Sequence, residues 1–164
     1  NMTATQLLAD TFNETRNITR FYLSKLKEKD PLQVFTVNGV RLNSAYWLTA
    51  HLAWAEHFLL LQGTGSTVAL PDFLKDYGIS SNGEVPADAP DYKTILHTLN
   101  SQHEIALQHL LSLSDEALQQ PNPLGITFGT SNTVKMVIQH AIRHEGTHAG
   151  HIGWLCKLHG VATL

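Results

Sequence analysis

Apolar residues recur with the period of an α-helix in four long stretches of the chain. Each stretch places its apolar residues on one side of a wheel that turns by about 100° per residue. Ser44 is a typical N-cap for the second stretch, and Gly160 ends the fourth. The pattern predicts an all-α fold, an antiparallel four-helix bundle. The predicted helices span residues 4–28, 44–62, 91–113 and 131–158.

The apolar side of each wheel indicates which residues should enter the core. For the third helix this side carries Ile95, Leu99, Ala106, Leu110 and Leu113. For the first helix it carries Leu7, Leu8, Thr11, Thr15, Ile18, Tyr22 and Leu26.

Two of the predicted connections are long, at residues 30–43 and 64–90. The first contains a short β-prone run in which Asn38-Gly39 is typical of a hairpin turn. The second is longer than a plain helix connection needs, so we expect it to hold a short helix near residues 71–77 and to serve as a lid. An exposed aromatic residue of this lid, Phe73 or Tyr77, would then help to select a substrate.

Composition and charge narrow the classes of function. With 164 residues, 43% of them apolar and 15% charged, the chain is expected to form one soluble domain over residues 1–164. A net charge of -3 offers no basic surface for nucleic acid or for a membrane. We also expect a cytoplasmic protein, because no signal peptide is legible and the single Cys156 cannot form an internal disulfide.

Histidine is the unusual residue, with ten copies. On the fourth helix His140, His144, His148 and His151 fall within about 80° of one another on the wheel. Buried imidazoles need partners for their ring nitrogens, at a cost of about 1–3 kcal/mol for each that lacks one. Two histidines spaced i, i+4 can both reach one metal ion, so His144 and His148 are the first candidates for ligands.

A third ligand is expected from the second helix. His51 lies at the centre of its apolar face, whereas His57 lies on the far side and is expected at the surface. Three inward histidines from facing helices would make a site with open coordination positions. The alternative is that these histidines are hydrogen-bonded core residues. His103, on the apolar side of the third helix, is a rival ligand or a supporting residue, and His140 and His151 are expected to support the ligands or face the substrate.

His144-Glu145-Gly146-Thr147-His148 also matches the motif of zinc proteases. Such enzymes need a further ligand, commonly an acidic residue after the motif, and no acidic residue follows Glu145. The extended protease pattern fails as well, because His151 stands where it requires glycine. The motif therefore does not indicate a protease.

With these residues in view, the chain resembles the DinB/YfiT-like superfamily. The last-helix pattern of that family is approximately His-Glu-x-x-His-x-Gly-Gln-Ile, and it corresponds here to residues 144–152, with His151 in place of the usual Gln. His51, followed by Trp54 and Glu56, resembles the histidine region of the family's second helix. The resemblance implies a four-helix bundle, often dimeric, that holds one divalent ion, nickel or zinc, on His51, His144 and His148.

The resemblance also implies a reaction class, since some relatives are transferases or isomerases that act on low-molecular-weight thiols. Our leading hypothesis is a metal-dependent enzyme, a thiol S-transferase or a hydrolase, in which the ion activates a bound thiol or water. Glu145 and His151 are the candidate catalytic residues, and the expected partners are a small-molecule substrate and a second copy of the chain. The alternatives are a non-catalytic metal-binding protein, with His151 as a fourth ligand, and a plain dimerising helical bundle.

Overall fold

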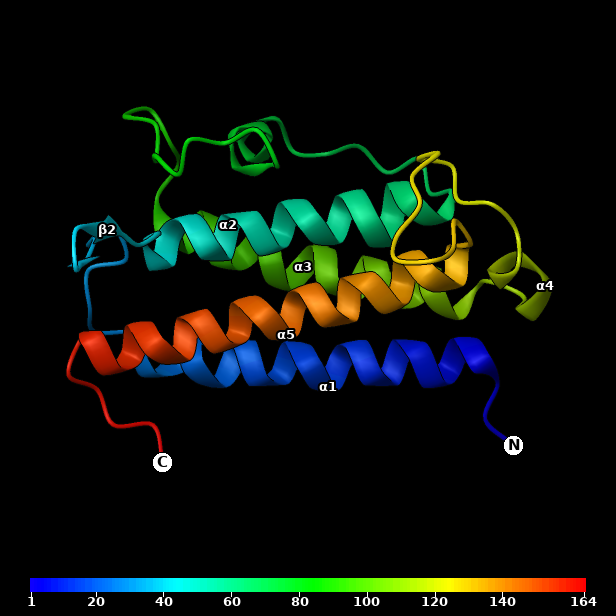
Figure 1. Cartoon of the computed structure of the whole chain (residues 1–164), viewed down its shortest axis with the longest axis horizontal. Coiled ribbons are helices and arrows are strands. Elements are labelled where there is room, and N and C mark those ends of the chain that lie inside the picture. The colour runs from blue at the N-terminus through cyan, green and yellow to red at the C-terminus, as the bar shows by residue number, and fades with distance from the viewer.

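The computed structural model describes residues 1–164, and the protein is mostly helical. Four long helices lie side by side (Figure 1). α1 packs against α5 and α3, and α2 packs against α3 and α5, so each long helix has two long neighbours. The four helices are α1 (Ala4–Lys25), α2 (Ala45–Glu56), α3 (Tyr92–Leu111) and α5 (Val134–Leu158).

The direction of the chain follows from the colours of Figure 1. α1 and α5 run the same way, and α2 and α3 run the opposite way (Figure 1). Residues 65–91 must therefore return along the whole length of α2 before α3 can begin, which accounts for the long connection that the sequence shows. This order differs from a simple alternation of direction along the chain.

Side-chain caps begin the helices where the sequence predicts them. Ser44 accepts a hydrogen bond from the backbone N–H of Trp47, at 3.1 Å, which confirms it as the N-cap of α2. Asp91 and Thr133 cap α3 and α5 in the same way. α2 does not end in a loop but continues as a π-helix over His57–Leu61 and a 3-10 helix over Gln62–Thr64.

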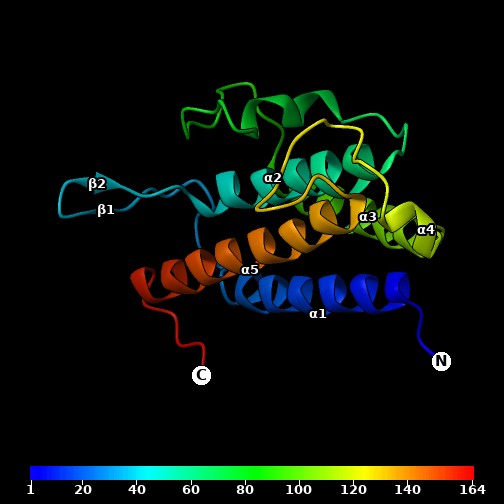
Figure 2. The ribbon, with the colours of Figure 1, turned by 45° about the vertical axis from the view of Figure 1, so that its right-hand side comes forward.

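The connections contain the predicted small elements. β1 (Thr36–Val37) and β2 (Val40–Arg41) form an antiparallel hairpin, which stands out beyond the start of α2 (Figure 2). Its turn residues Asn38 and Gly39 have φ values of 51° and 78°, as a two-residue hairpin turn requires. A 3-10 helix, η3 (Asp72–Tyr77), lies over α2, and a short helix, α4 (Asp115–Leu118), precedes α5.

The predicted core face of the first helix is only partly correct. Leu26 is buried and Tyr22 is half-buried, but Leu7 and Ile18 are 55% and 51% exposed. The wheel misplaced the face because three of the residues of α1 that enter the core are polar, Thr5, Arg16 and Thr19, and a stripe of hydrophobic residues does not include them. The buried residues of α1 are Thr5, Ala9, Phe12, Arg16, Thr19 and Leu23.

The other expected core faces agree better with the structure. Ile95, Leu99, Ala106 and Leu110 of α3 are buried, and so is Cys156 of α5. No helix of the protein is both long and apolar enough to cross a membrane.

Candidate metal centre

His51 is held in a stack of aromatic rings along one side of α2. Its ring lies between those of Trp47 and Trp54, with centroid distances of 4.7 and 5.9 Å and interplanar angles of 13° and 15°. The spacing i−4 and i+3 brings both tryptophans to the same side of the helix. His51 is only 7% exposed, so its ring has little freedom to turn.

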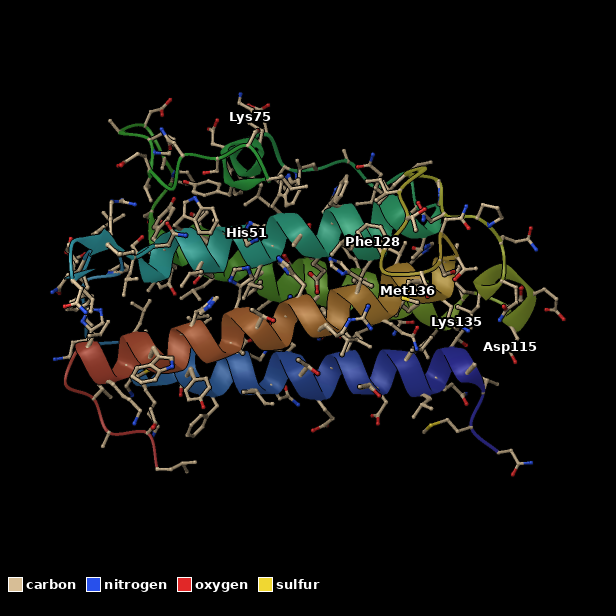
Figure 3. All side chains as sticks on the ribbon, viewed as in Figure 1. His51, Lys75, Asp115, Phe128, Lys135 and Met136 are labelled. Atoms are coloured by element: carbon tan, nitrogen blue, oxygen red, sulfur yellow. The ribbon has the colours of Figure 1, made fainter.

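The backbone of η3 fixes the second ring nitrogen of His51. Nδ1 lies 2.7 Å from the carbonyl oxygen of Tyr77, and because a carbonyl only accepts, Nδ1 carries the proton. The neutral ring then presents the lone pair of Nε2. Figure 3 shows His51 on α2, below the segment that holds Lys75. A hydrogen bond of this kind, from one ring nitrogen to a backbone carbonyl, is typical of histidines that bind metal through the other nitrogen.

α5 brings His144 and His148 to the same point. Nε2 of His144 lies 3.1 Å from Nε2 of His51, although 93 residues separate them in the sequence. One ligand nitrogen from each of His51, His144 and His148 lies within 4.8 Å of the other two. The structure therefore brings together the three residues that the sequence predicts as metal ligands.

The surroundings keep these imidazoles neutral. Burial, followed by the nearby His51 and His140, lowers the pKa of His144 to about 4. Burial, followed by the neighbouring His144 and His51, lowers the pKa of His148 to about 3. Burial also lowers the pKa of His51 against the opposing effect of the Tyr77 carbonyl. A metal ion needs neutral imidazoles, so the donors are in the right state at neutral pH.

The donor set fits a divalent ion. Nitrogen ligands of a tetrahedral zinc ion stand about 3.3 Å apart, which follows from Zn–N distances of about 2.0–2.1 Å. The 3.1 Å between His51 and His144 is close to this value, and small side-chain rotations would bring in His148. Imidazole ligands without thiolates suit zinc and nickel alike.

Two further histidines of the α5 stripe lie at the edge of this cluster. Nδ1 of His151 lies 3.2 Å from Nδ1 of His148, so one of these nitrogens donates to the other. His151 is exposed and is not one of the three clustered ligands. The ring of His140 packs against that of Phe128, with centroids 4.6 Å apart and planes tilted by 35°, and His140 lies about one helical turn before His144.

Glu145 points away from the cluster. Its Oε2 accepts hydrogen bonds from Arg16 Nε at 2.8 Å and from Thr19 Oγ1 at 2.6 Å, and its Oε1 accepts one from Arg16 Nη2 at 3.1 Å. Burial alone would raise the pKa of Glu145, but the charge and hydrogen bonds of Arg16 lower it overall. The carboxylate that follows the first histidine of the motif therefore joins α5 to α1.

The same buried network explains His103. Arg16 also pairs with Glu56, with Nη2 3.1 Å from Oε2. His103 Nδ1 lies 2.8 Å from that oxygen of Glu56, and its Nε2 lies 2.8 Å from Oδ1 of Asn13. With both ring nitrogens in use and no place among the clustered ligands, His103 is not a rival metal ligand.

Two sequence expectations for single residues are wrong. His57 is not at the surface but only 6% exposed, because residues 65–70 pass over it and the carbonyl of Val68 lies 2.6 Å from its Nε2. Tyr77 is fully buried, so it offers no exposed ring. Phe73, the other aromatic residue proposed for the lid, is half-buried.

A cavity adjoins the cluster at His148. It has a volume of about 560 Å³ and opens between the β1–β2 hairpin and the second half of α5. His148 and His151 belong to its wall. A small molecule in this cavity would therefore lie beside the candidate ligands. No pattern in the sequence predicts the cavity, because its walls come from the hairpin, the start of α2 and the end of α5, which lie far apart in the chain.

These features define a class: helical proteins in which the second and last long helices can hold one metal ion with three histidines. The family model of the DinB superfamily matches residues 11–152, which is most of the chain and includes all three histidines. The chain belongs to the DinB superfamily. No curated protein matches it.

Proposed function

We propose that this member of the DinB superfamily is a metal-dependent enzyme that binds one nickel or zinc ion on His51, His144 and His148, on a four-helix bundle. The observation that carries the proposal is the clustering of the three ligand nitrogens within 4.8 Å, with Nδ1 of His51 already bonded to Tyr77. The adjoining cavity supports an enzyme over a purely structural metal site, because a substrate there would reach the ligand cluster.

The proposed reaction is the transfer of a low-molecular-weight thiol to an electrophile, or hydrolysis. A bound divalent ion lowers the pKa of a thiol or a water molecule and so supplies the nucleophile at neutral pH. The protein's own residues orient the ligands: Trp47 and Trp54 hold the ring of His51, and Tyr77 fixes its protonated nitrogen. His151 lines the cavity next to His148, where it can take up or release a proton.

A non-catalytic metal site is the second candidate, and one observation favours it. His151 lies 3.2 Å from His148, so a rotation of its ring would offer a fourth nitrogen and close the site. Cobalt substitution separates the two candidates. If a coordination position is open, addition of mercaptoethanol to the Co(II) protein will produce a thiolate-to-cobalt charge-transfer band. A closed site gives no band in the parent protein but gains one in His151→Ala.

The test of the metal site itself is elemental analysis. We expect about one equivalent of metal in the untagged protein and a loss of at least 90% of it in His51→Ala and in His148→Ala, because two nitrogens hold an ion far more weakly than three. His97→Ala, on the exposed side of α3, is the matched control and should keep its metal. Circular dichroism of every variant excludes misfolding as the cause. Absence of metal from the reconstituted parent would overturn the proposal.

We further propose a cytoplasmic homodimer. The exposed apolar side chains of Ile18 and Phe21 on α1, 51% and 37% exposed, supply a surface for the second copy. Sedimentation equilibrium of the parent and of Ile18→Lys tests the dimer, since a lysine in the interface would dissociate it.

A further inference from the structure

The cavity beside His148 is apolar over most of its wall. Its volume of about 560 Å³ lies within the range of about 300–1,000 Å³ that small-molecule sites usually have. Leu48 is buried and forms part of the inner wall, whereas Trp154 and Leu158 of α5 are partly exposed. Burying an apolar molecule here would remove much of this exposed area from water, which favours a ligand with an apolar body.

The charge in the cavity wall is positive. Arg41 is the only residue with a permanent charge among those that line it, and no acidic residue lines it. The terminal nitrogens of Arg41 lie 3.4 Å from the carbonyl oxygen of Gly83, which holds the guanidinium at the cavity edge. A guanidinium pairs with carboxylate, sulfonate or phosphate oxygens through two parallel hydrogen bonds.

Glu84 is the one acidic competitor for Arg41. The two side chains are 3.6 Å apart and are 63% and 38% exposed, respectively. Ion pairs this exposed contribute little, so an incoming anion can replace Glu84 at small cost. Removing Glu84 should therefore strengthen anion binding, and removing Arg41 should weaken it.

We propose that this cavity binds an amphipathic anion, with its apolar body against Leu48, Trp154 and Leu158 and its acidic group on Arg41. The inference rests on the proposed function, since such a molecule would be the electrophilic substrate and would lie beside His148. Specificity for the substrate then comes from the β1–β2 hairpin and the end of α5. Residues 65–91 hold His51 in place through Tyr77 and bring Gly83 and Glu84 next to Arg41.

Two fluorescent probes test the proposal on the full chain. Anilinonaphthalene sulfonate is an amphipathic anion, and N-phenylnaphthylamine is its uncharged analogue. We expect the sulfonate to bind about fivefold more weakly to Arg41→Gln and about twofold more tightly to Glu84→Gln, as a partly exposed charge pair predicts. The neutral probe should bind equally to all three proteins. Added salt should weaken only the sulfonate, because it screens the pair.

Matched variants locate the binding. Arg20→Gln makes the same change on α1, away from the cavity, and should bind both probes as the parent does. Trp154→Ala removes part of the apolar wall and should weaken both probes about tenfold, whereas Trp154→Phe should lose much less. Near-ultraviolet circular dichroism verifies native packing, since the sulfonate probe also binds loosened proteins.

Several results would overturn the proposal. Equal binding of both probes that Arg41→Gln leaves unchanged would show that no anion is recognised. Binding that Trp154→Ala leaves unchanged would place the probes elsewhere, and probe affinity that falls as protein concentration rises would show that a second copy of the chain covers the cavity.

Metal content, measured on the same preparations, separates this proposal from the proposed function. Specific probe binding by a protein that holds no metal would support the ligand site and overturn the proposed metal-dependent function. Bound metal without specific probe binding would support the metal site and overturn the proposed anion site.

Discussion

The buried pair between Arg16 and Glu145 gives a prediction that separates a structural role from a catalytic one. Arg16 is fully buried and Glu145 is 2% exposed, and three hydrogen bonds of 2.6–3.1 Å satisfy the carboxylate. Replacing Glu145 by Gln removes the charge and turns an N–H group of the amide toward the donors of Arg16. Removal of one partner from a buried pair costs about 3–5 kcal/mol.

The loss of unfolding free energy depends on which partner of the buried pair is removed. After Glu145→Gln, Arg16 still pairs with Glu56, so we expect the lower cost of about 3 kcal/mol. After Arg16→Met, the carboxylates of Glu145 and Glu56 are both left without their cation, so we expect about 5 kcal/mol. For a protein of this size each kcal/mol lowers the melting temperature by about 2–4 °C. Arg16→Met should therefore melt clearly below Glu145→Gln.

The assay is urea unfolding of metal-free protein, followed by circular dichroism. Glu104→Gln, the same change on the exposed side of α3, is the control and should stay within about 0.5 kcal/mol of the parent. Because the folded pKa of Glu145 is lowered, its contribution is present above the ordinary glutamate pKa of about 4.3 and is lost as the pH falls through the lower folded pKa, where the gap between parent and Glu145→Gln should narrow.

One result would refute the structural reading of Glu145. If Glu145→Gln unfolds at the same urea concentration as the parent but abolishes turnover of a thiol or an ester in the metal-loaded protein, the carboxylate acts in catalysis. The reversed order, with Arg16→Met milder than Glu145→Gln, would show that Arg16 does not hold both carboxylates.

Three further predictions concern packing, metal and pH. A Cβ at Gly153 would lie 3.0–3.3 Å from the ring of Tyr22, whereas one at Gly150 meets nothing, so Gly153→Ala should be about 1–3 kcal/mol less stable than Gly150→Ala in urea unfolding. Removing the metal with a chelator should lower the unfolding free energy by about 4 kcal/mol if the free ion stood at a thousand times its Kd, and equal stability with and without metal would contradict specific binding. The folded pKa values of His144 and His148, about 4 and about 3, lie below the ordinary value. The unfolded chain therefore binds more protons below pH 6.5, and the metal-free protein should lose stability from pH 7 to 4, with a slope below about 1.4 kcal/mol per pH unit for each histidine because both are partly exposed. His148→Ala should show a shallower slope, and an unchanged slope would contradict the assignment.

The local signals in the sequence were sufficient for the helices and their caps. Ser44 caps α2 as predicted, and the hairpin turn falls at Asn38-Gly39. The long helices begin within about three residues of their predicted starts. These features depend on residues close together in the chain, which a periodicity or a turn motif records directly.

The features that the sequence did not reveal depend on distant partners. Arg16 faces the core because Glu145 and Glu56 meet it there, and no local pattern in α1 marks a buried arginine. The hydrogen bond that orients His51 comes from the backbone carbonyl of Tyr77. Any residue at position 77 has such a carbonyl, so the residue type there does not reveal the contact. The three ligands could be predicted because His51 and the α5 pair each lie where the wheel points inward, but the cavity beside them could not.

The position of the three histidines along the chain also orders the assembly of the protein. His51 leaves the ribosome long before His144 and His148, which arrive together on the last helix. Until α5 has docked, the nascent chain offers only one of the three nitrogens, and a single imidazole holds a divalent ion weakly. Capture of the proposed ion would therefore follow the closure of the last helix, and the ion would then join the two ends of a segment of more than ninety residues. Binding of the proposed ion would then report that the last helix has docked on the rest of the bundle.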